Sequence, residues 1–421
     1  MILASKVTQT SAFLDEQSPS KVFEYRIALL DNQAVRFGDA EPDISTMPIT
    51  HLDLDPTEAC NLRCSYCFKG KLRGRNMSLE TAKQSVRFLV KYSGAIRNIS
   101  VAMLGGEPLL AFPLMKKWVP WASRYCEQRG KKLNFQVTTN GTVFDQEHHD
   151  FFRYWHIGLH LSLDGCPEVQ DQERKYADGA GSSKKVEQNL PTIFSAWRTV
   201  HARSTVVPET VAHLSESYRY FCEKGFQKVA FSLAHSDRWD NPATLKVLEK
   251  EFRKVLDYHW ELMKKKKRYF ILTILDTFVE SQKNKEPAGS ICGAARGSLH
   301  VDTEGILWPC HRFNGIKPHE YFVLGSIRGG FNNTFRNCFL RIDPRRDFPP
   351  RCATCVARIA CLPTCVSANW QENDNLFDPG EGYCRAKQLL YKLCQEHAET
   401  LKKQEPRQWK KYTDWITNPK D

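Results

Sequence analysis

The sequence predicts an α/β fold, an open barrel of six strand–helix units followed by a small cysteine-rich domain. From Ile49 onward, short β-rich runs alternate with amphipathic helical runs, which is typical of parallel βαβ units. Six such units are fewer than the eight of a closed TIM barrel, so a partial barrel is expected. After Gly289 the periodicity fades, and cysteines and turn residues become frequent. This change indicates a domain held together by metal.

Each predicted strand is short, and a helical run separates it from the next strand. The strands are expected at 50–55, 98–104, 133–139, 158–164, 201–207 and 228–233. The helical run 78–92 has Ser78 as its expected N-cap, because a serine hydroxyl accepts hydrogen bonds from free N–H groups there. A long helix follows the sixth strand, and its apolar face consists of Leu245, Leu248, Phe252, Val255, Leu256 and Leu262.

The length of 421 residues exceeds what one hydrophobic core usually organises. The expected parts are an N-terminal extension at 1–48 with a strand or strand pair at 21–30, the barrel at 49–270, a linker at 271–289, the cysteine-rich domain at 290–394 and a basic tail at 395–421. The tail contains Trp409, Tyr412 and Trp415. It is predicted to be a helix packed on the body, with a partner contact as the alternative.

Composition places the protein in the cytoplasm and excludes a membrane partner. No apolar run is long enough for a membrane span, and the N-terminus has no secretory signal. The net charge of +12 suits an acidic peptide or nucleic acid. No RNA-binding signature accompanies this charge, so no nucleic-acid partner is expected. The basic run 264–268 ends the long helix, where cations complement the helix dipole; a docking patch is the alternative.

Three cysteines lie close together after the first predicted strand. Cys60, Cys64 and Cys67 occupy one short loop, and we call them the first cysteine group. Three thiolates on a loop can hold three irons of a cubane iron–sulfur cluster, which leaves the fourth iron open to a chelating ligand. On spacing alone, a zinc knuckle with a fourth ligand from elsewhere is the alternative.

The arrangement of this loop and of the following strand ends resembles the radical SAM family. The loop has the spacing CxxxCxΦC, and later strands end in GGEP at 105–108, TTNG at 138–141 and SLDG at 162–165. A QDxxR pattern at 170–174 precedes GAGS at 179–182, with Gln170 in place of the family's histidine. The resemblance implies that the open iron binds S-adenosylmethionine, whose reductive cleavage gives a 5′-deoxyadenosyl radical.

The resemblance also implies a set of cofactor-binding residues at the strand ends. They are Tyr66, Gly105, Gly106, Glu107, Pro108, Thr139, Asn140, Ser162, Asp164, Arg174 and Arg203. Glu107 is expected to accept from the amino group of the cofactor, and Arg203 to pair with its carboxylate. Taken singly, the glycine-containing motifs also suit ordinary turns, and Arg203 also suits a surface position.

Seven of the cysteines in the cysteine-rich region follow a recognisable motif, and they are too many for one zinc ion. From the number of cysteines alone, two zinc sites are an alternative. The pattern resembles the SPASM extension of radical SAM enzymes, which implies two auxiliary 4Fe–4S clusters and three clusters in all. One auxiliary set is Cys292, Cys310 and Cys365, the second cysteine group. The other is Cys352, Cys355, Cys361 and Cys384, the third cysteine group.

Two positions depart from the sulfatase-maturing branch of this family. Ser298 stands where that branch has a further cluster cysteine, and His311 stands where it has an aspartate base. The sequence Pro-Cys-His-Arg-Phe around His311 instead resembles maturases of ribosomally made peptides. His311 is therefore the candidate catalytic base, with a structural role in holding its loop as the alternative.

The remaining cysteines have mainly structural explanations. Cys126 and Cys222 lie in amphipathic helical runs and are expected in the core. Cys338 and Cys394 are spare candidates for the second cysteine group, but burial as small apolar residues is the favoured explanation. Cys166 follows a strand end. A structural role is expected there, with a redox or substrate-binding role as the alternative.

The expected function is that of a radical SAM oxidoreductase that matures a ribosomal precursor peptide. It would abstract a hydrogen atom and form a carbon–carbon, ether or thioether crosslink between side chains. The alternatives are formylglycine formation of the sulfatase-maturing type, or peptide epimerisation or excision. Expected partners are the precursor peptide and an electron donor such as flavodoxin or ferredoxin. The short N-terminal extension leaves a separate leader-binding protein open as a further partner.

Overall fold

The computed structural model describes residues 47–70, 74–235, 237–266, 270–283, 292–315, 322–342, 347–361 and 365–417. Nearly all of the predicted N-terminal extension lies outside these residues, including its strand at 21–30. The same holds for residues 284–289 of the predicted linker and for the last residues of the tail.

All six predicted barrel strands are present, and they pair in chain order. They are β1 (His51–Leu54), β3 (Asn98–Met103), β4 (Lys132–Thr139), β5 (Gly158–Ser162), β7 (His201–Val206) and β8 (Lys228–Leu233). Every neighbouring pair among them is parallel. The strands therefore end at one common edge, and the partial (β/α)6 barrel is confirmed.

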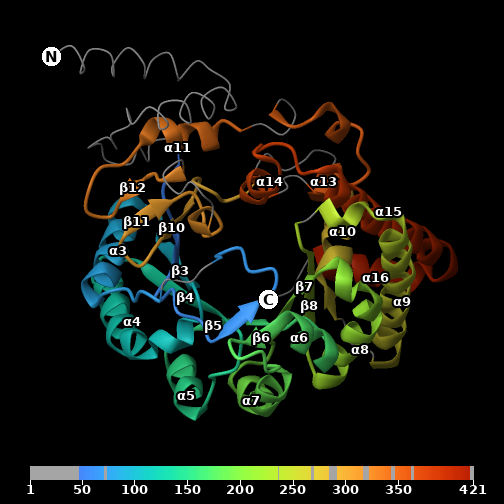
Figure 1. Cartoon of the computed structure of the whole chain (residues 1–421), viewed down its shortest axis with the longest axis horizontal. Coiled ribbons are helices and arrows are strands. Elements are labelled where there is room, and N and C mark those ends of the chain that lie inside the picture. Colours follow the sequence, from blue (N-terminus) through green and yellow to red (C-terminus); the bar gives the residue numbers. More distant parts are fainter. Residues whose placement is uncertain are drawn as a thin grey trace.

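Helices cover the outside of these strands, as Figure 1 shows around the central sheet. They are α3 (Leu79–Tyr92), α4 (Phe112–Glu127), α5 (Gln146–Tyr154), α6 (Pro167–Glu173), α7 (Ser183–Ala196) and α8 (Leu214–Lys224), with 3-10 turns η1 (Pro108–Ala111) and η2 (Pro208–His213). The predicted N-cap is confirmed, because the Ser78 hydroxyl accepts from Thr81 N at 3.0 Å. Large side chains such as Trp118, Phe152 and Phe221 are fully buried between the helices and the strands.

The cysteine-rich region is joined to the barrel through the same sheet. Strand β10 (Ser298–Val301) pairs in parallel with β1, and β11 (Ile306–Trp308) and β12 (Gly325–Ser326) follow it antiparallel. Within the described residues the sheet has ten strands, with β9 (Ile271–Leu272) at the opposite edge. The C-terminal region thus continues the first barrel strand directly.

Residues 271–283, which the sequence assigned to a linker, form regular structure instead. They comprise β9, paired with β8, and helix α10 (Thr273–Lys283). Leu272 and Leu275 are fully buried, so the apolar residues of this segment belong to the core. Polar residues at its end gave the segment its linker-like composition.

The remaining elements form the rest of the cysteine-rich region or pack beside α8 and α10. They are η3 (Asp237–Asp240), α9 (Pro242–Lys266), η4 (Phe313–Gly315), α11 (Asn333–Leu340), η6 (Pro350–Cys352), α13 (Arg358–Cys361), α14 (Val366–Asn373), α15 (Glu381–Gln404) and α16 (Pro406–Thr417). The predicted long helix is α9, and Lys264–Lys266 lie in its last turn, as the dipole interpretation requires. No helix in the described ranges has the length and apolarity to cross a bilayer.

The tail packs on the body as predicted. Trp409, Tyr412 and Ile416 of α16 are buried, and the Tyr412 hydroxyl donates to Asp276 Oδ1 of α10 at 2.5 Å. Burial raises the pKa of Asp276 to about 7. A titratable carboxyl group therefore lies at the contact between α10 and α16.

We predict that Asp276 makes the protein less stable as the pH rises toward neutrality. Its pKa is about 7 in the folded chain against an ordinary value of 3.8. The folded state therefore holds a proton that the unfolded state releases, and stability falls by up to about 1.4 kcal/mol per pH unit between these values. Melting temperatures of the wild type and Asp276→Asn, measured from about pH 5 to about pH 8, should diverge as pH rises. The amide still accepts from Tyr412, so equal pH dependence in both proteins would contradict the prediction.

Candidate functional site

The first cysteine group follows the carboxyl end of β1, at the edge where all barrel strands end. Cys64 closes the short strand β2 (Leu62–Cys64), which pairs with β6 (Arg174–Tyr176). Cys60 and Cys64 are half-buried and Cys67 is exposed. The Leu62 N–H donates to Cys60 Sγ at 3.4 Å. Such N–H···S contacts stabilise thiolate and tune iron–sulfur clusters.

The glycines of the GGEP motif contact the backbone of the cysteine loop. Gly106 N donates to Thr57 O at 2.9 Å, and Glu107 N donates to Ala59 O at 2.8 Å. A Cβ on Gly106 would lie 2.1 Å from Ala59 O, and one on Gly105 would lie 2.4 Å from Thr57 O. These positions require glycine because the loop carrying the cysteines lies directly against them.

Glu107 turns inward and joins the second strand end to the third. Its buried carboxylate accepts from Thr139 Oγ1 at 2.7 Å, Asn140 N at 2.8 Å and Leu109 N at 3.1 Å. A carboxylate offers about four lone-pair positions, so one position is left for a further donor. Burial raises the pKa of Glu107 although these hydrogen bonds oppose the shift. The residue thus fixes the loop geometry and keeps limited capacity for a ligand's ammonium group.

Asn140 extends this contact back to the cysteine loop. Its amide Nδ2 donates to Asn61 Oδ1 at 2.9 Å, and Asn61 Nδ2 donates to Thr142 Oγ1 at 2.7 Å. Asn61 lies between Cys60 and Leu62 in the sequence. The TTNG segment is therefore hydrogen-bonded to the loop itself.

Tyr66, Asp164 and Arg174 come together on the other side of the loop. The Tyr66 hydroxyl donates to Asp164 Oδ2, and Arg174 Nη1 donates to the Tyr66 oxygen at 2.7 Å. Asp164 also accepts from Thr205 N at 2.9 Å. Burial raises the pKa of Asp164, against the opposing charge of Arg174. Three of the predicted cofactor-binding residues thus form one buried cluster.

Gln170, which departs from the family pattern, supports this cluster. Its Oε1 accepts from Asp164 N at 3.0 Å, and its Nε2 donates to Ser182 Oγ at 2.9 Å. The side chain is fully buried, so the amide replaces histidine without leaving a polar group unpaired. Ser162 and Arg203 lie opposite each other in the β5–β7 register, and Arg203 is exposed.

His311 lies against the end of β1 and pairs with a carboxylate that the sequence analysis did not single out. His311 Nδ1 is 2.8 Å from Asp53 Oδ2, and Asp53 Oδ1 is 3.0 Å from His51 Nε2. Burial would raise the pKa of Asp53, but the hydrogen bonds and charges of the two histidines hold it well below its usual range. The polar alternation of His51 and Asp53 in an otherwise apolar strand was the available sequence signal.

A second carboxylate on β1, Asp55, binds both the cysteine loop and the cysteine-rich region. Lys69, two residues after Cys67, forms a buried ion pair with Asp55. Asn314 Nδ2 donates to the same carboxylate at 3.1 Å, and His300 Nε2 lies 3.3 Å from it. Lys69, Asp55 and His300 were also missed, because their pairing joins segments far apart in the chain.

The second and third cysteine groups each gather their own members. Burial, and then the neighbouring thiols of Cys365 and Cys292, raise the pKa of Cys310. Burial raises the pKa of Cys361 to about 12, and the other thiols of the third cysteine group add to this shift although the cation of Lys387 opposes it. Thiols that the motif assigns to one set therefore lie near one another, and the assignment of each set to a cluster stays a prediction.

The sulfur spacing in all three groups is too wide for one zinc ion. Sulfur ligands around a single tetrahedral zinc lie roughly 3.8 Å apart. Among the residues described, no three of these thiols lie within 4.8 Å of one another. A cubane cluster binds each thiolate through a different iron, so wider spacing suits it.

Aromatic and cationic side chains lie between the cysteine groups. The Arg312 guanidinium is 4.8 Å from the centre of the Phe68 ring, next to Cys67. Burial and the nearby Cys361 and Cys365 thiols raise the pKa of Tyr383 well above its usual range. Tyr383 also stacks on His235, with ring centres 4.1 Å apart. Tyr383 therefore lies where the second and third cysteine groups approach each other.

The spare cysteines behave as predicted. Cys126, Cys338 and Cys394 are fully buried, and Cys222 is half-buried against the core. Ser298 lies on β10 opposite His51 of β1. Cys166 is buried beside η2 and α8.

We predict that Gly106→Ala prevents the first cysteine group from holding its cluster. The added Cβ would collide with backbone, which cannot move away as a flexible side chain can. Iron analysis after anaerobic reconstitution should show a loss of about four irons per chain. The matched control is Gly158→Ala, whose Cβ would come no nearer than 3.4 Å to a side-chain carbon and 3.6 Å to a backbone oxygen. Equal iron content in both variants would contradict the prediction.

Comparison with known proteins agrees with this geometry. Residues 54–221 match the Radical SAM superfamily model. A cysteine-type anaerobic sulfatase-maturating enzyme of Clostridium novyi (strain NT) is 24% identical over 347 residues, covering 76% of this chain and 89% of the relative. An uncharacterized protein of Methanocaldococcus jannaschii is 28% identical over 281 residues, covering 66% of this chain and 88% of the relative.

Solved structures share the fold. Native anSMEcpe with bound AdoMet and Cp18Cys peptide has a TM-score of 0.70 at 21% identity, covering 88% of this chain and 100% of that chain. Streptococcus suis SuiB bound to precursor peptide SuiA has a TM-score of 0.54 at 15% identity, covering 86% and 79%. The family implies S-adenosylmethionine and a 4Fe–4S cluster. Residues 54–221 therefore form a radical SAM domain.

Proposed function

We propose that this enzyme matures a ribosomal precursor peptide by forming a crosslink between side chains. The observation that carries the proposal is the position of His311 and Arg312 beside the first cysteine loop. The ring of Phe68 is 5.7 Å from that of His311, and Gly315 lies so close to Phe68 that a Cβ would be 2.4 Å from its carbonyl oxygen. These contacts support a role for His311 as a base near the place where the radical would be made.

Peptide substrates are supported by the relatives and the structural neighbours. Several relatives are named as anaerobic sulfatase-maturating enzymes. Two neighbours were solved with peptides, Cp18Cys in one and the precursor SuiA in the other. The net charge of +12 adds a general attraction for an acidic peptide.

The first cysteine group would hold the catalytic cluster. When bound, the cluster and S-adenosylmethionine supply the 5′-deoxyadenosyl radical that removes a hydrogen atom from the peptide. Glu107 and Arg203 would orient the amino and carboxylate groups of the cofactor. The remaining predicted contacts are Tyr66, Gly105, Gly106, Pro108, Thr139, Asn140, Ser162, Asp164 and Arg174.

The second and third cysteine groups would hold two auxiliary 4Fe–4S clusters. The third group has four thiols, enough for every iron of a cubane, while the second has three and Ser298 at the position of the missing cysteine. Crosslinking removes two hydrogens from the peptide, one as an atom and the other as a proton and an electron. Iron–sulfur centres near the base are suitable acceptors for that electron.

His311 would accept the proton released when the crosslink forms. Asp53 contacts Nδ1, which leaves Nε2 as the nitrogen available to the substrate. The carboxylate stabilises the protonated imidazole and fixes its orientation. Asp53 and His51 are therefore positioning residues, and His311 is the catalytic one.

Formylglycine formation is the second candidate, because the sulfatase-maturating relatives support peptide oxidation as such. Ser298 and His311 argue against formylglycine formation, because the sulfatase-maturing branch has cysteine and aspartate at these two positions. Epimerisation or excision within a peptide is the remaining alternative. Flavodoxin or ferredoxin as electron donor, and a separate leader-binding protein, belong to the proposal as partners.

We predict that a peptide encoded beside this enzyme's gene loses two hydrogens on treatment and acquires no aldehyde. Mass spectrometry with a hydrazide reagent checks this, because serine-derived formylglycine has the same mass change but reacts with hydrazide. Cysteine-derived formylglycine would replace sulfur by oxygen. Deuterium uptake from solvent without a net reaction would indicate epimerisation. A hydrazide-reactive product, or no change in any such peptide, would contradict the crosslinking proposal.

We predict that His311→Gln lowers product formation at least about a hundredfold. Cleavage of S-adenosylmethionine to 5′-deoxyadenosine should stay within about twofold, since the base acts after hydrogen abstraction. The matched control is His149→Gln, because His149 pairs with Asp150 on α5, away from the site. Asp53→Asn should lower product formation while sparing cofactor cleavage, because it weakens the contact that orients the imidazole. Equal loss of cofactor cleavage and product would assign His311 a purely structural role.

A further inference from the structure

We infer that Cys166, His213 and Glu216 form a binding site for a divalent transition metal ion of the zinc class. One ligand atom from each residue lies within 4.8 Å of the other two. Within the described part of the chain, no other set of three histidine, cysteine or acidic side chains meets this condition. The site lies outside all three cysteine groups.

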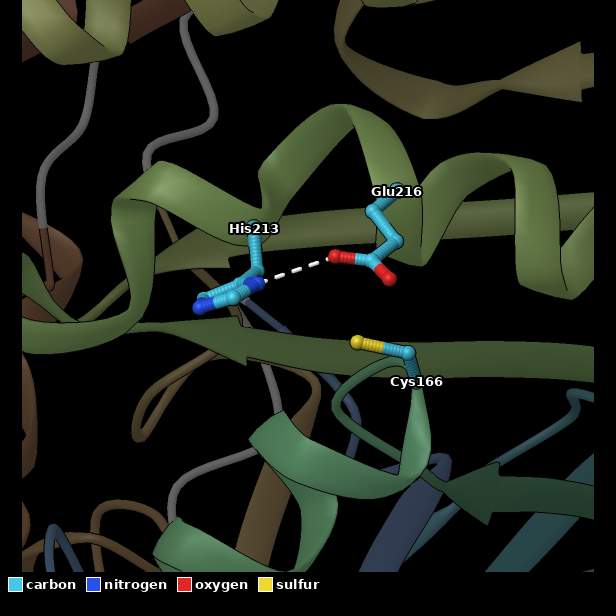
Figure 2. A group of neighbouring side chains, drawn as sticks. All are labelled: Cys166, His213 and Glu216. Atoms are coloured by element: carbon cyan, nitrogen blue, oxygen red, sulfur yellow. Dashed lines mark hydrogen bonds and ion pairs between the residues drawn. The ribbon is translucent and has the colours of Figure 1, made fainter.

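The three side chains come from two elements that follow neighbouring barrel strands. Cys166 caps α6 in the loop after β5, while His213 ends η2 and Glu216 lies in the first turn of α8. His213 and Glu216 are three residues apart, so they share one face of the helix start. Figure 2 shows the Cys166 sulfur pointing toward the space between the imidazole and the carboxylate.

The ligand chemistry selects the metal class. Thiolate, imidazole and carboxylate are the ligands that zinc uses, at about 2.0–2.3 Å from the ion. Calcium and magnesium require oxygen ligands, so a thiol disfavours them. His213 Nδ1 is 2.9 Å from Glu216 Oε2, close to the separation of two ligands on one tetrahedral zinc. Binding would replace this hydrogen bond with two metal–ligand bonds, release the thiol proton, and leave the neutral imidazole with its proton on Nε2.

The site is closed on one side and open on the other. Cys166 is only 3% exposed, whereas the side chains of His213 and Glu216 are 46% and 60% exposed. Three protein ligands leave a fourth tetrahedral position, which here faces solvent and suits a water molecule. An ion can therefore enter from the surface without opening the core.

The backbone that carries Cys166 is already held against α8. Ser217 Oγ accepts from Cys166 N at 3.4 Å and lies 3.7 Å from its sulfur. A Cβ on Gly165 would lie 2.0 Å from the Ser217 hydroxyl, so the loop and the helix are in close contact. This contact fixes the sulfur position before any metal arrives, which lowers the cost of forming the site.

A metal ion here would link the β5 loop to the start of α8. Asp164, two residues before Cys166, holds the Tyr66 hydroxyl of the cysteine loop. The ion would therefore strengthen the wall of the cofactor site without contacting the cofactor. The inference does not depend on which peptide reaction the enzyme performs.

The test uses the complete cluster-loaded enzyme under anaerobic conditions, with zinc at a buffered free concentration. We expect one zinc per chain by elemental analysis. Zinc-edge X-ray absorption, which the iron clusters do not obscure, should show one sulfur and three nitrogen or oxygen ligands. A zinc ion that replaces iron in a cysteine group would instead show several sulfur ligands.

Variants distinguish zinc bound at the proposed site from zinc bound elsewhere on the protein. Cys166→Ser, His213→Ala and Glu216→Ala should each lose the ion or weaken its binding. The last two change exposed side chains, so the fold should persist. The matched control is Cys222→Ser, a half-buried cysteine in the same helix, which should retain full zinc. Absence of zinc, zinc bound mainly by sulfur, or zinc kept by both Cys166→Ser and His213→Ala would overturn the inference.

Discussion

Two carboxylates at the end of the first barrel strand hold together both regions that carry the proposed clusters. Asp53 binds His311, and Asp55 binds Lys69, His300 and Asn314. Burial alone would raise the pKa of Asp55, but Lys69 and His300 hold it well below its usual range. An isolated buried carboxylate is costly, and removing one partner of a buried pair typically costs about 3–5 kcal/mol. The cysteine loop and the cysteine-rich region are thus fixed relative to one strand by charge.

Hydrogen bonds from other strand ends also hold the cysteine loop in place. The GGEP segment hydrogen-bonds to the loop on one side, and the Tyr66, Asp164 and Arg174 cluster binds it on the other. Strand β10 extends the sheet next to β1, and His311 contacts both Asp53 of β1 and the ring of Phe68 next to the first cysteine group. Radical formation and the proposed proton transfer can therefore occur at neighbouring positions although their residues lie about 250 positions apart.

This arrangement also explains how one framework can support different peptide reactions. The barrel and short local motifs determine the position of the strand-end residues that are predicted to face the cofactor. Under the proposed function, the reaction outcome would depend on the base beside the loop and on the ligands of the second cysteine group. His311 and Ser298 differ from the sulfatase-maturing branch at both places, while the fold resembles a member of that branch with a TM-score of 0.70. Similar folds therefore leave the peptide reaction open, and the residues at these two places bear on it.

The sequence alone determined the six barrel strands, the long helix and the packed tail helix, and it predicts the membership of the three cysteine groups. These features depend on hydrophobic periodicity and on the spacing of short motifs, which are local properties of the chain. The sequence-based prediction of a linker was wrong at 271–283, because polar residues at the end of the segment outweighed the apolar residues that the structure buries. Only the tertiary structure revealed the pairing of Asp53 with His311, the ion pair of Asp55 with Lys69, the place of Tyr383, and the meeting of Cys166 with His213 and Glu216. Each of these depends on side chains from separate elements approaching within a few ångströms, and the packing of the whole barrel decides that approach.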